Sequence, residues 1–191
     1  MNLLKSSSKF SKKQIILLSI PVFFSNIAIP LVGMVDTGLM GNLSETKYLA
    51  ATSIASSVIT MVVWSFGFLR MGTVGLVSQA YGRSDYREIV RIVLRNFVIA
   101  LAASLLIIIF LPFIKIAVAN FFKVSDETKE LIYVYFNVRV FSVPAELLIY
   151  TLVGFYLGIQ KTRTSSLLII ILSFLNIIFS LLFVLNFNLN I

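Results

Sequence analysis

Four ionisable residues lie inside stretches that are otherwise strongly apolar: Asp36, Arg70, Arg139 and Glu146. A charge within a lipid bilayer costs about 2.5–3.5 kcal/mol on insertion scales, so such residues usually line a polar path or pair with one another. A carboxyl group there can also take up and release a proton, as in the relays of pumps and transporters. The four residues are therefore candidates for binding or moving ions and polar molecules through a membrane.

Asp36 lies near the outer end of the first apolar stretch, in the segment PLVGMVDTGLMG. Pro30, six residues earlier, leaves a backbone carbonyl without its helical partner and kinks the helix. Gly33, Gly38 and Gly41 would let neighbouring helices approach closely. We expect a small polar cavity in which the Asp36 carboxyl exchanges protons. The alternative is an interfacial Asp36 that caps a loop or faces water.

Arg139 and Glu146 are seven residues apart and would lie on nearly the same helix face, about 10 Å apart along its axis. Direct pairing requires both side chains to extend and would be helped by a kink at Pro144. A structural ion pair, snorkelling of both groups and a transport role all remain open. For Arg70, near the cytoplasmic end of its stretch, we expect a structural role or lipid contact.

Two polar residues and two glycines follow in the last apolar stretches. Asn176 and Ser180 are four residues apart and share a helix face, where they could bond to another helix for about 0.6–2 kcal/mol each or line a cavity. Gly154 and Gly158 form a GxxxG pair, which predicts close packing of two helices.

The composition requires a membrane to position these residues. The chain is 59% hydrophobic and 13% charged, with a mean hydropathy of +0.99. Crossing about 30 Å of hydrocarbon takes about 20 apolar residues in a helix. The sequence predicts an all-α polytopic bundle forming one domain over residues 1–191, with spans at residues 15–40, 49–80, 89–111, 131–158 and 165–185.

The basic residues predict the topology. With a cytoplasmic N-terminus, ten basic residues fall on the inside: Lys5, Lys9, Lys12, Lys13, Arg83, Arg87, Arg91, Arg95, Lys161 and Arg163. Four fall outside: Lys47, Lys115, Lys123 and Lys129. Because Lys and Arg resist translocation, this split predicts that the chain starts inside and ends outside. The first span is too long for a secretory signal and lacks a cleavage site, so we expect it to be retained.

Several functions are excluded by what the sequence lacks. There is no Cys and no His, which removes thiol chemistry, imidazole bases and the usual zinc sites. There is no GxxxxGK phosphate loop, so neither an enzyme nor an ATP-driven pump is expected. The net charge of +8 lies in short loops between spans, which indicates membrane lipid and not nucleic acid as the partner. No cofactor is expected.

Four segments resemble the N-terminal lobe of MATE transporters of the DinF-like branch: PLVGMVDTGLMG, YLAATSIASSV, FLRMGTVGLVSQAYGRSD and YFNVRVFSVPAELLIYTLVGFYLGIQKTR. The resemblance covers nearly the whole chain. It implies twelve helices in two lobes around a central cavity, in the bacterial inner membrane. It also implies export of organic cations, drugs or metabolites in exchange for H⁺ or Na⁺. With about five helices here, we expect a truncated chain that lacks the C-terminal lobe.

The resemblance also implies roles for single residues. Asp36 occupies the position of the coupling carboxyl, and Asn176 matches an Asn of the same polar cluster. Ser180 stands where many relatives have a second Asp, which leaves Asp36 as the main coupling group. Glu146, beside the proline, could supply a second carboxyl to the cavity. Two alternatives stay open: a flippase for lipid-linked precursors, favoured by Arg70 and Arg139, and a non-transporting scaffold or fragment.

Overall fold

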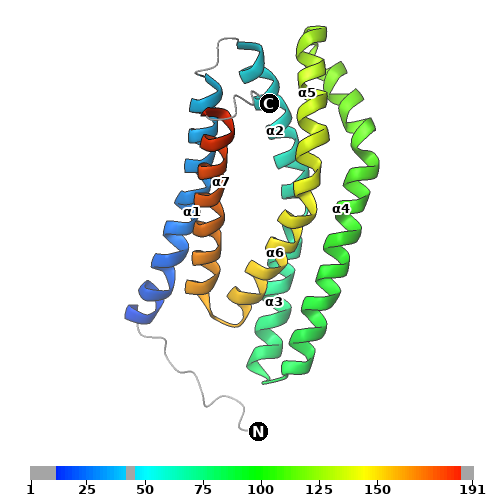
Figure 1. The fold of residues 1–191 in the computed structure, drawn as a ribbon. Helices are drawn as coiled ribbons and strands as arrows, with labels where there is room; N and C mark the ends of the chain where they lie inside the picture. The colour runs from blue at the N-terminus through cyan, green and yellow to red at the C-terminus, as the bar shows by residue number, and fades with distance from the viewer. Residues whose placement is uncertain (1–11, 42–45, 186–191) are drawn as a thin grey trace.

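The protein is a bundle of helices (Figure 1). The computed structural model describes residues 12–41 and 46–185, and every regular element in these ranges is helical. The elements are α1 (Lys12–Gly41), α2 (Thr46–Ser65), α3 (Phe68–Gly82), α4 (Tyr86–Phe122), α5 (Asp126–Arg139), the short 3₁₀ helix η1 (Val140–Ser142), α6 (Val143–Gly158) and α7 (Thr162–Leu185). The predicted all-α fold is confirmed.

Five spans among the described residues are long and apolar enough to cross a membrane, as predicted. Two of them consist of two helices each: α2 with α3, and α5 with α6 through η1. The first break lies at Phe66 and Gly67, whose amides donate to the carbonyls three residues earlier instead of four. The second break is η1, and α6 then begins with Pro144 in its first turn, where the missing N–H costs nothing.

Helix α4 is the longest element and continues beyond the expected span at residues 89–111. It runs through Pro112 to Phe122 and is 37 residues long. Its start is fixed by Asp85, whose side chain accepts a hydrogen bond from the Glu88 amide at 3.0 Å. Its end is marked by Lys123 in the left-handed conformation, with φ 46°.

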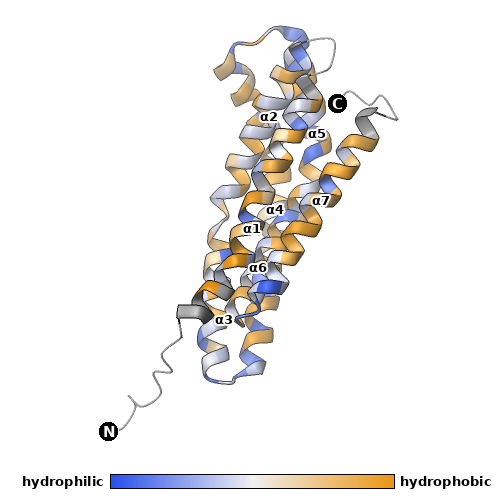
Figure 2. Ribbon diagram, turned by 90° about the vertical axis from the view of Figure 1, so that its left-hand side faces the viewer, coloured by the Kyte–Doolittle hydropathy of each residue, from blue (hydrophilic) through white to orange (hydrophobic). Residues whose placement is uncertain are grey.

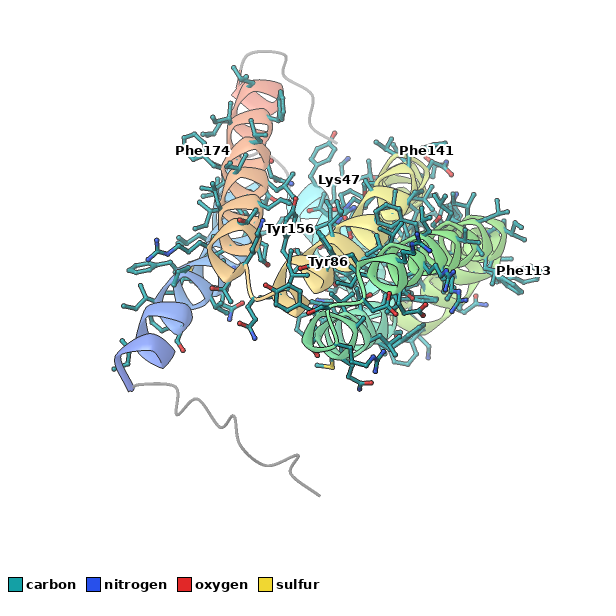
Figure 3. All side chains as sticks on the ribbon, turned by 90° about the horizontal axis from the view of Figure 1, so that it is seen from below. Lys47, Tyr86, Phe113, Phe141, Tyr156 and Phe174 are labelled. Carbon is teal, nitrogen blue, oxygen red and sulfur yellow. The ribbon has the colours of Figure 1, made fainter. Side chains whose placement is uncertain are left out.

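Most of the helices pack around a shared hydrophobic core, and one pair of helices packs beside them. Helices α2, α4, α5 and α6 share one hydrophobic core that includes Phe136 and Leu147. Helix α3 packs tightly on α6, while α1 packs mainly on α7. Seen from below, the α1–α7 pair stands beside the cluster formed by α2 to α6 (Figure 3). Ser25 of α1, almost fully buried, donates to the Val22 carbonyl and contacts the Ser166 hydroxyl of α7.

The outer surface of the bundle is apolar. Hydrophobic residues cover the middle of the helices, and hydrophilic ones gather at the α3–α4 and α4–α5 turns (Figure 2). Phe113 and Phe174 are 66% and 63% exposed and point away from the bundle (Figure 3). Such a surface is stable in lipid, because there the exposed apolar side chains need no cover.

Candidate functional site

A polar cavity of about 470 Å³ lies between the α1–α7 pair and helices α2 and α5. Its described walls carry many hydroxyl groups, one carboxylate and one guanidinium. The lining residues are Val32, Gly33, Asp36 and Thr37 of α1, Leu49, Thr52, Ser53, Ser56 and Thr60 of α2, Tyr135 and Arg139 of α5, and Asn176 and Ser180 of α7. The cavity lies toward the end of the bundle where α1 connects to α2 (Figure 1).

Asp36, Asn176 and Ser180, which the resemblance linked, lie in the walls of this one cavity. The Asp36 side chain is half-buried, and among the described residues it has no ion-pair or hydrogen-bond partner. Ser180 Oγ lies 3.5 Å from Asn176 Oδ1, one helical turn away. The cavity therefore offers a carboxylate and an amide–hydroxyl pair from two different helices to an ion or a polar ligand.

Arg139 forms an ion pair with Glu146 across the break in the fourth span. Arg139 Nη1 contacts Glu146 Oε1 and also donates to the Ser142 hydroxyl of η1. The single Ser142 hydroxyl proton has two acceptors within reach, the Arg139 carbonyl oxygen at 2.7 Å and Glu146 Oε1 at 3.3 Å. Arg139 lines the cavity, whereas Glu146 is not among the lining residues and reaches it only through Arg139.

The predicted packing residues have different surroundings. A Cβ atom on Gly154 would lie 2.7 Å from Thr73 Cβ, and one on Gly158 would lie 2.7 Å from Val77 Cβ, so both glycines allow α6 to approach α3. A Cβ on Gly33 would meet nothing within 4 Å. The expectation of close packing at Gly33 is therefore wrong for this chain, because that residue faces the cavity.

The two prolines and Arg70 lie outside the cavity walls. Pro30 sits within α1, which remains helical on both sides of it. Pro144 begins α6 and so marks the break between α5 and α6. Arg70 of α3 is half-buried and lies within electrostatic range of Tyr150, which also faces Glu146. Arg70 thus belongs to the surroundings of the Arg139–Glu146 pair.

Sequence reasoning missed two parts of the wall. Tyr135 lies one turn before Arg139 and interacts with it, and Asp36 and Glu146 are also in range. Thr52, Ser56 and Thr60 recur every four residues along one face of α2, a spacing that could have indicated a polar wall.

The polar face of α2 continues into a second, shallower groove of about 640 Å³. It shares Ser56 and Thr60 with the cavity and ends at Met61 and Trp64. Trp64, the single tryptophan of the sequence, is 73% exposed. Among the described residues no group of three or more acidic, His or Cys side chains could hold a metal ion.

Comparison with known proteins gives consistent matches. The MatE family model matches residues 21–182. DNA damage-inducible protein F of Escherichia coli K12 is 31% identical over 175 residues, which are 91% of this chain and 38% of that protein. Multidrug resistance protein NorM of Photobacterium profundum is 31% identical over 151 residues, covering 78% of this chain and 32% of NorM. The chain thus spans less than two fifths of the length of these relatives.

Two solved structures share the fold. A MOP superfamily transporter from Pyrococcus furiosus superposes with a TM-score of 0.82 at 20% identity, covering 92% of this chain and 39% of the other. A MATE protein in complex with Br-NRF gives a TM-score of 0.66 at 20% identity, covering 92% and 40%. At this identity the likeness establishes the fold alone.

Proposed function

The chain belongs to the MatE family, whose members are transporters and not enzymes, and we propose that it forms one lobe of an antiporter that exports organic cations in exchange for protons. The observation that carries the proposal is the cavity that holds Asp36 together with Asn176 and Ser180. A carboxylate that has no ion-pair partner among the described residues of such a cavity can bind either a cation or a proton, but not both. Competition for one site is the simplest basis of exchange.

The charge balance of the cavity supports a cationic substrate. Asp36 contributes one negative charge, and the positive charge of Arg139 is offset by Glu146. An organic cation bound there would meet a net negative site with hydroxyl groups around it. An anionic lipid-linked precursor would need a free positive charge, so the ion pair favours export of cations over the flippase alternative.

The cycle follows from the competition at Asp36. Protonation of Asp36 from the outer side neutralises the carboxylate and favours release of the bound cation. Loss of the proton toward the cytoplasm then restores the site. Pro30 leaves one helical hydrogen bond of α1 unmade, so α1 can bend there as the site changes. Each proton that moves down the membrane potential supplies about 2.3 kcal/mol per 100 mV. Sodium could replace the proton as the coupling ion at the same carboxylate.

We also propose that a second lobe completes the transporter. The chain spans 38% of DNA damage-inducible protein F, and the described residues that line the groove ending at Trp64 all belong to α2. This open face of α2, which carries both hydroxyl groups and Trp64, is a surface for which a facing lobe would provide the other wall. The transport reaction therefore belongs to the two-lobe protein, in which this lobe carries the coupling carboxylate.

We place the protein in the bacterial inner membrane with its N-terminus in the cytoplasm. Arg83 lies at the α3–α4 turn and Arg87, Arg91 and Arg95 in the first turns of α4, at the same end of the bundle as the start of α1 (Figure 1). The positive-inside rule assigns that end to the cytoplasm. Lys5 and Lys9, which enter the same prediction, lie outside the described residues. The cavity then lies in the outer half of the membrane.

The decisive experiment is ethidium efflux from proteoliposomes that contain the two-lobe transporter under an imposed pH gradient. Asp36→Asn should abolish gradient-driven efflux, because the amide can neither bind a proton nor balance a cation. Thr37→Ser, a change in the neighbouring wall that keeps the hydroxyl, is the matched control and should retain efflux. Efflux by Asp36→Asn at the normal rate would refute the proposal.

A further inference from the structure

Arg139 pairs with Glu146 and also lines the cavity that holds Asp36. Both of its short contacts, to Glu146 Oε1 and to Ser142 Oγ, use the same nitrogen, Nη1. Arg139 also interacts with Tyr135 and lines the cavity. Arg139 is also the one cationic side chain among the described residues that line the cavity. The guanidinium thus pairs with the carboxylate of Glu146 and lines the same cavity as the carboxylate of Asp36.

The two carboxylates are not equally dependent on Arg139. Asp36 has no ion-pair partner among the described residues, and Arg139 is the one cationic side chain of the described cavity wall that could balance an ionised Asp36 with no bound cation. Glu146 Oε1 lies 3.3 Å from Ser142 Oγ, which can donate to it, and Glu146 and Arg70 are both within electrostatic range of Tyr150. The free-energy cost of leaving Glu146 without Arg139 is therefore smaller than the cost of leaving an ionised Asp36 without any counter-charge.

We propose that Arg139 is an exchangeable counter-charge, which pairs with Glu146 while a cation or a proton occupies Asp36 and turns to Asp36 when that carboxylate is empty. The proposal rests on the proposed function, since it takes Asp36 to be the binding carboxylate. Arg139 is then a positioning residue that competes with the substrate. Glu146 holds the displaced guanidinium and so lowers the cost of loading the cavity.

The exchange predicts opposite effects for the two partners of one ion pair. Without the Glu146 charge, Arg139 stays on Asp36 and the substrate cation must displace it, so binding weakens. Without the Arg139 charge, the cation meets no competitor, so binding tightens. Once Arg139 is removed, the loss of Glu146 should matter little. A purely structural ion pair would give losses of the same sign for both residues.

The test is equilibrium binding of radiolabelled tetraethylammonium to the full chain in lipid nanodiscs, with empty nanodiscs as background. Glu146→Gln should raise Kd about tenfold and Arg139→Gln should lower it about tenfold, from the change of one nearby charge in a partly polar site. The double variant should bind like Arg139→Gln. Arg139→Lys and Glu146→Asp keep their charges and should stay near the wild-type Kd.

The outcomes separate this inference from the proposed function. Two results together support the exchange. The wild type binds the cation and Asp36→Asn does not, and Glu146→Gln and Arg139→Gln shift Kd in opposite directions. Shifts in the same direction, or a Glu146→Gln effect that persists without Arg139, overturn the exchange while the cation site stands. Absence of binding to the wild type overturns both. If Arg139→Gln does not fold, the Glu146→Gln and Glu146→Asp pair still decides, since only the neutral variant should weaken binding.

Discussion

The contact between α3 and α6 depends on Gly154, and Gly154→Ala should destabilise the bundle. The added Cβ would lie 2.7 Å from Thr73 Cβ and 2.8 Å from the Arg70 carbonyl oxygen. Carbon atoms normally pack at about 3.5–4.0 Å, so one helix must move by about 1 Å. Thr73 cannot turn aside easily, because its hydroxyl donates to the Leu69 carbonyl and accepts from Asn96 Nδ2 at 2.8 Å.

The magnitude follows from two opposing terms. Overpacking of a close contact costs about 1–3 kcal/mol, and a clash with backbone belongs at the upper end of that range. Alanine is favoured over glycine within a helix by about 1 kcal/mol. The net loss for Gly154→Ala is then about 1–2 kcal/mol, which lowers the melting temperature by about 5 °C for a chain of this length. Gly75→Ala in α3 is the matched control, because its Cβ would meet nothing within 4 Å.

The assay is thermal unfolding in detergent, followed by the fluorescence of Trp64 and by helical circular dichroism. Trp64 is the single tryptophan of the chain, so its signal needs no deconvolution. Gly75→Ala should melt at or above the wild-type temperature, and Gly154→Ala below it. A Gly154→Ala variant as stable as Gly75→Ala would show that α3 and α6 are not in close contact in the folded protein.

Two smaller perturbations test the polar contacts and the helix start. Asn96→Ala removes the hydrogen bond to Thr73 and should cost about 1 kcal/mol, seen as a lower melting temperature; an unchanged melting curve would contradict the bond. Asp85→Ala removes the cap of α4 and should cost about 1 kcal/mol, with faster hydrogen exchange at the Glu88 amide. Exchange at that amide no faster than in the wild type would mean that the cap does not form.

The number of spans, and the presence of Asp36 among the residues that line the cavity, were predictable from the sequence. Long apolar runs leave few alternatives to membrane helices, since every backbone polar group must be satisfied within lipid. Asp36 was recognisable as a candidate because an ionisable group within an apolar membrane span is energetically costly and usually has a function. Asn176 and Ser180 were expected near it only through the family resemblance, because helix spacing alone does not say which helices face each other.

The breaks within two spans were not predictable in the same way. Hydropathy is an average over many residues, so the break at Gly67 and the 3₁₀ turn before Pro144 leave the apolar pattern intact. The turn changes which residues meet: Arg139 and Glu146, about 10 Å apart on an ideal helix, pair across the bend between α5 and α6 (Figure 1). Glycines are also ambiguous in the sequence: Gly154 lies at a close helix contact, whereas Gly33 lines the open cavity.

The central claim is that cation and proton compete for Asp36, and proton release on binding tests it most directly. Tetraethylammonium is added to the chain in weakly buffered nanodiscs over a series of pH values, and the released protons are counted with a pH indicator. The wild type should release up to about one proton per bound cation, and Asp36→Asn should release none. Binding without proton release at any pH, or equal release from Asp36→Asn, would contradict the account.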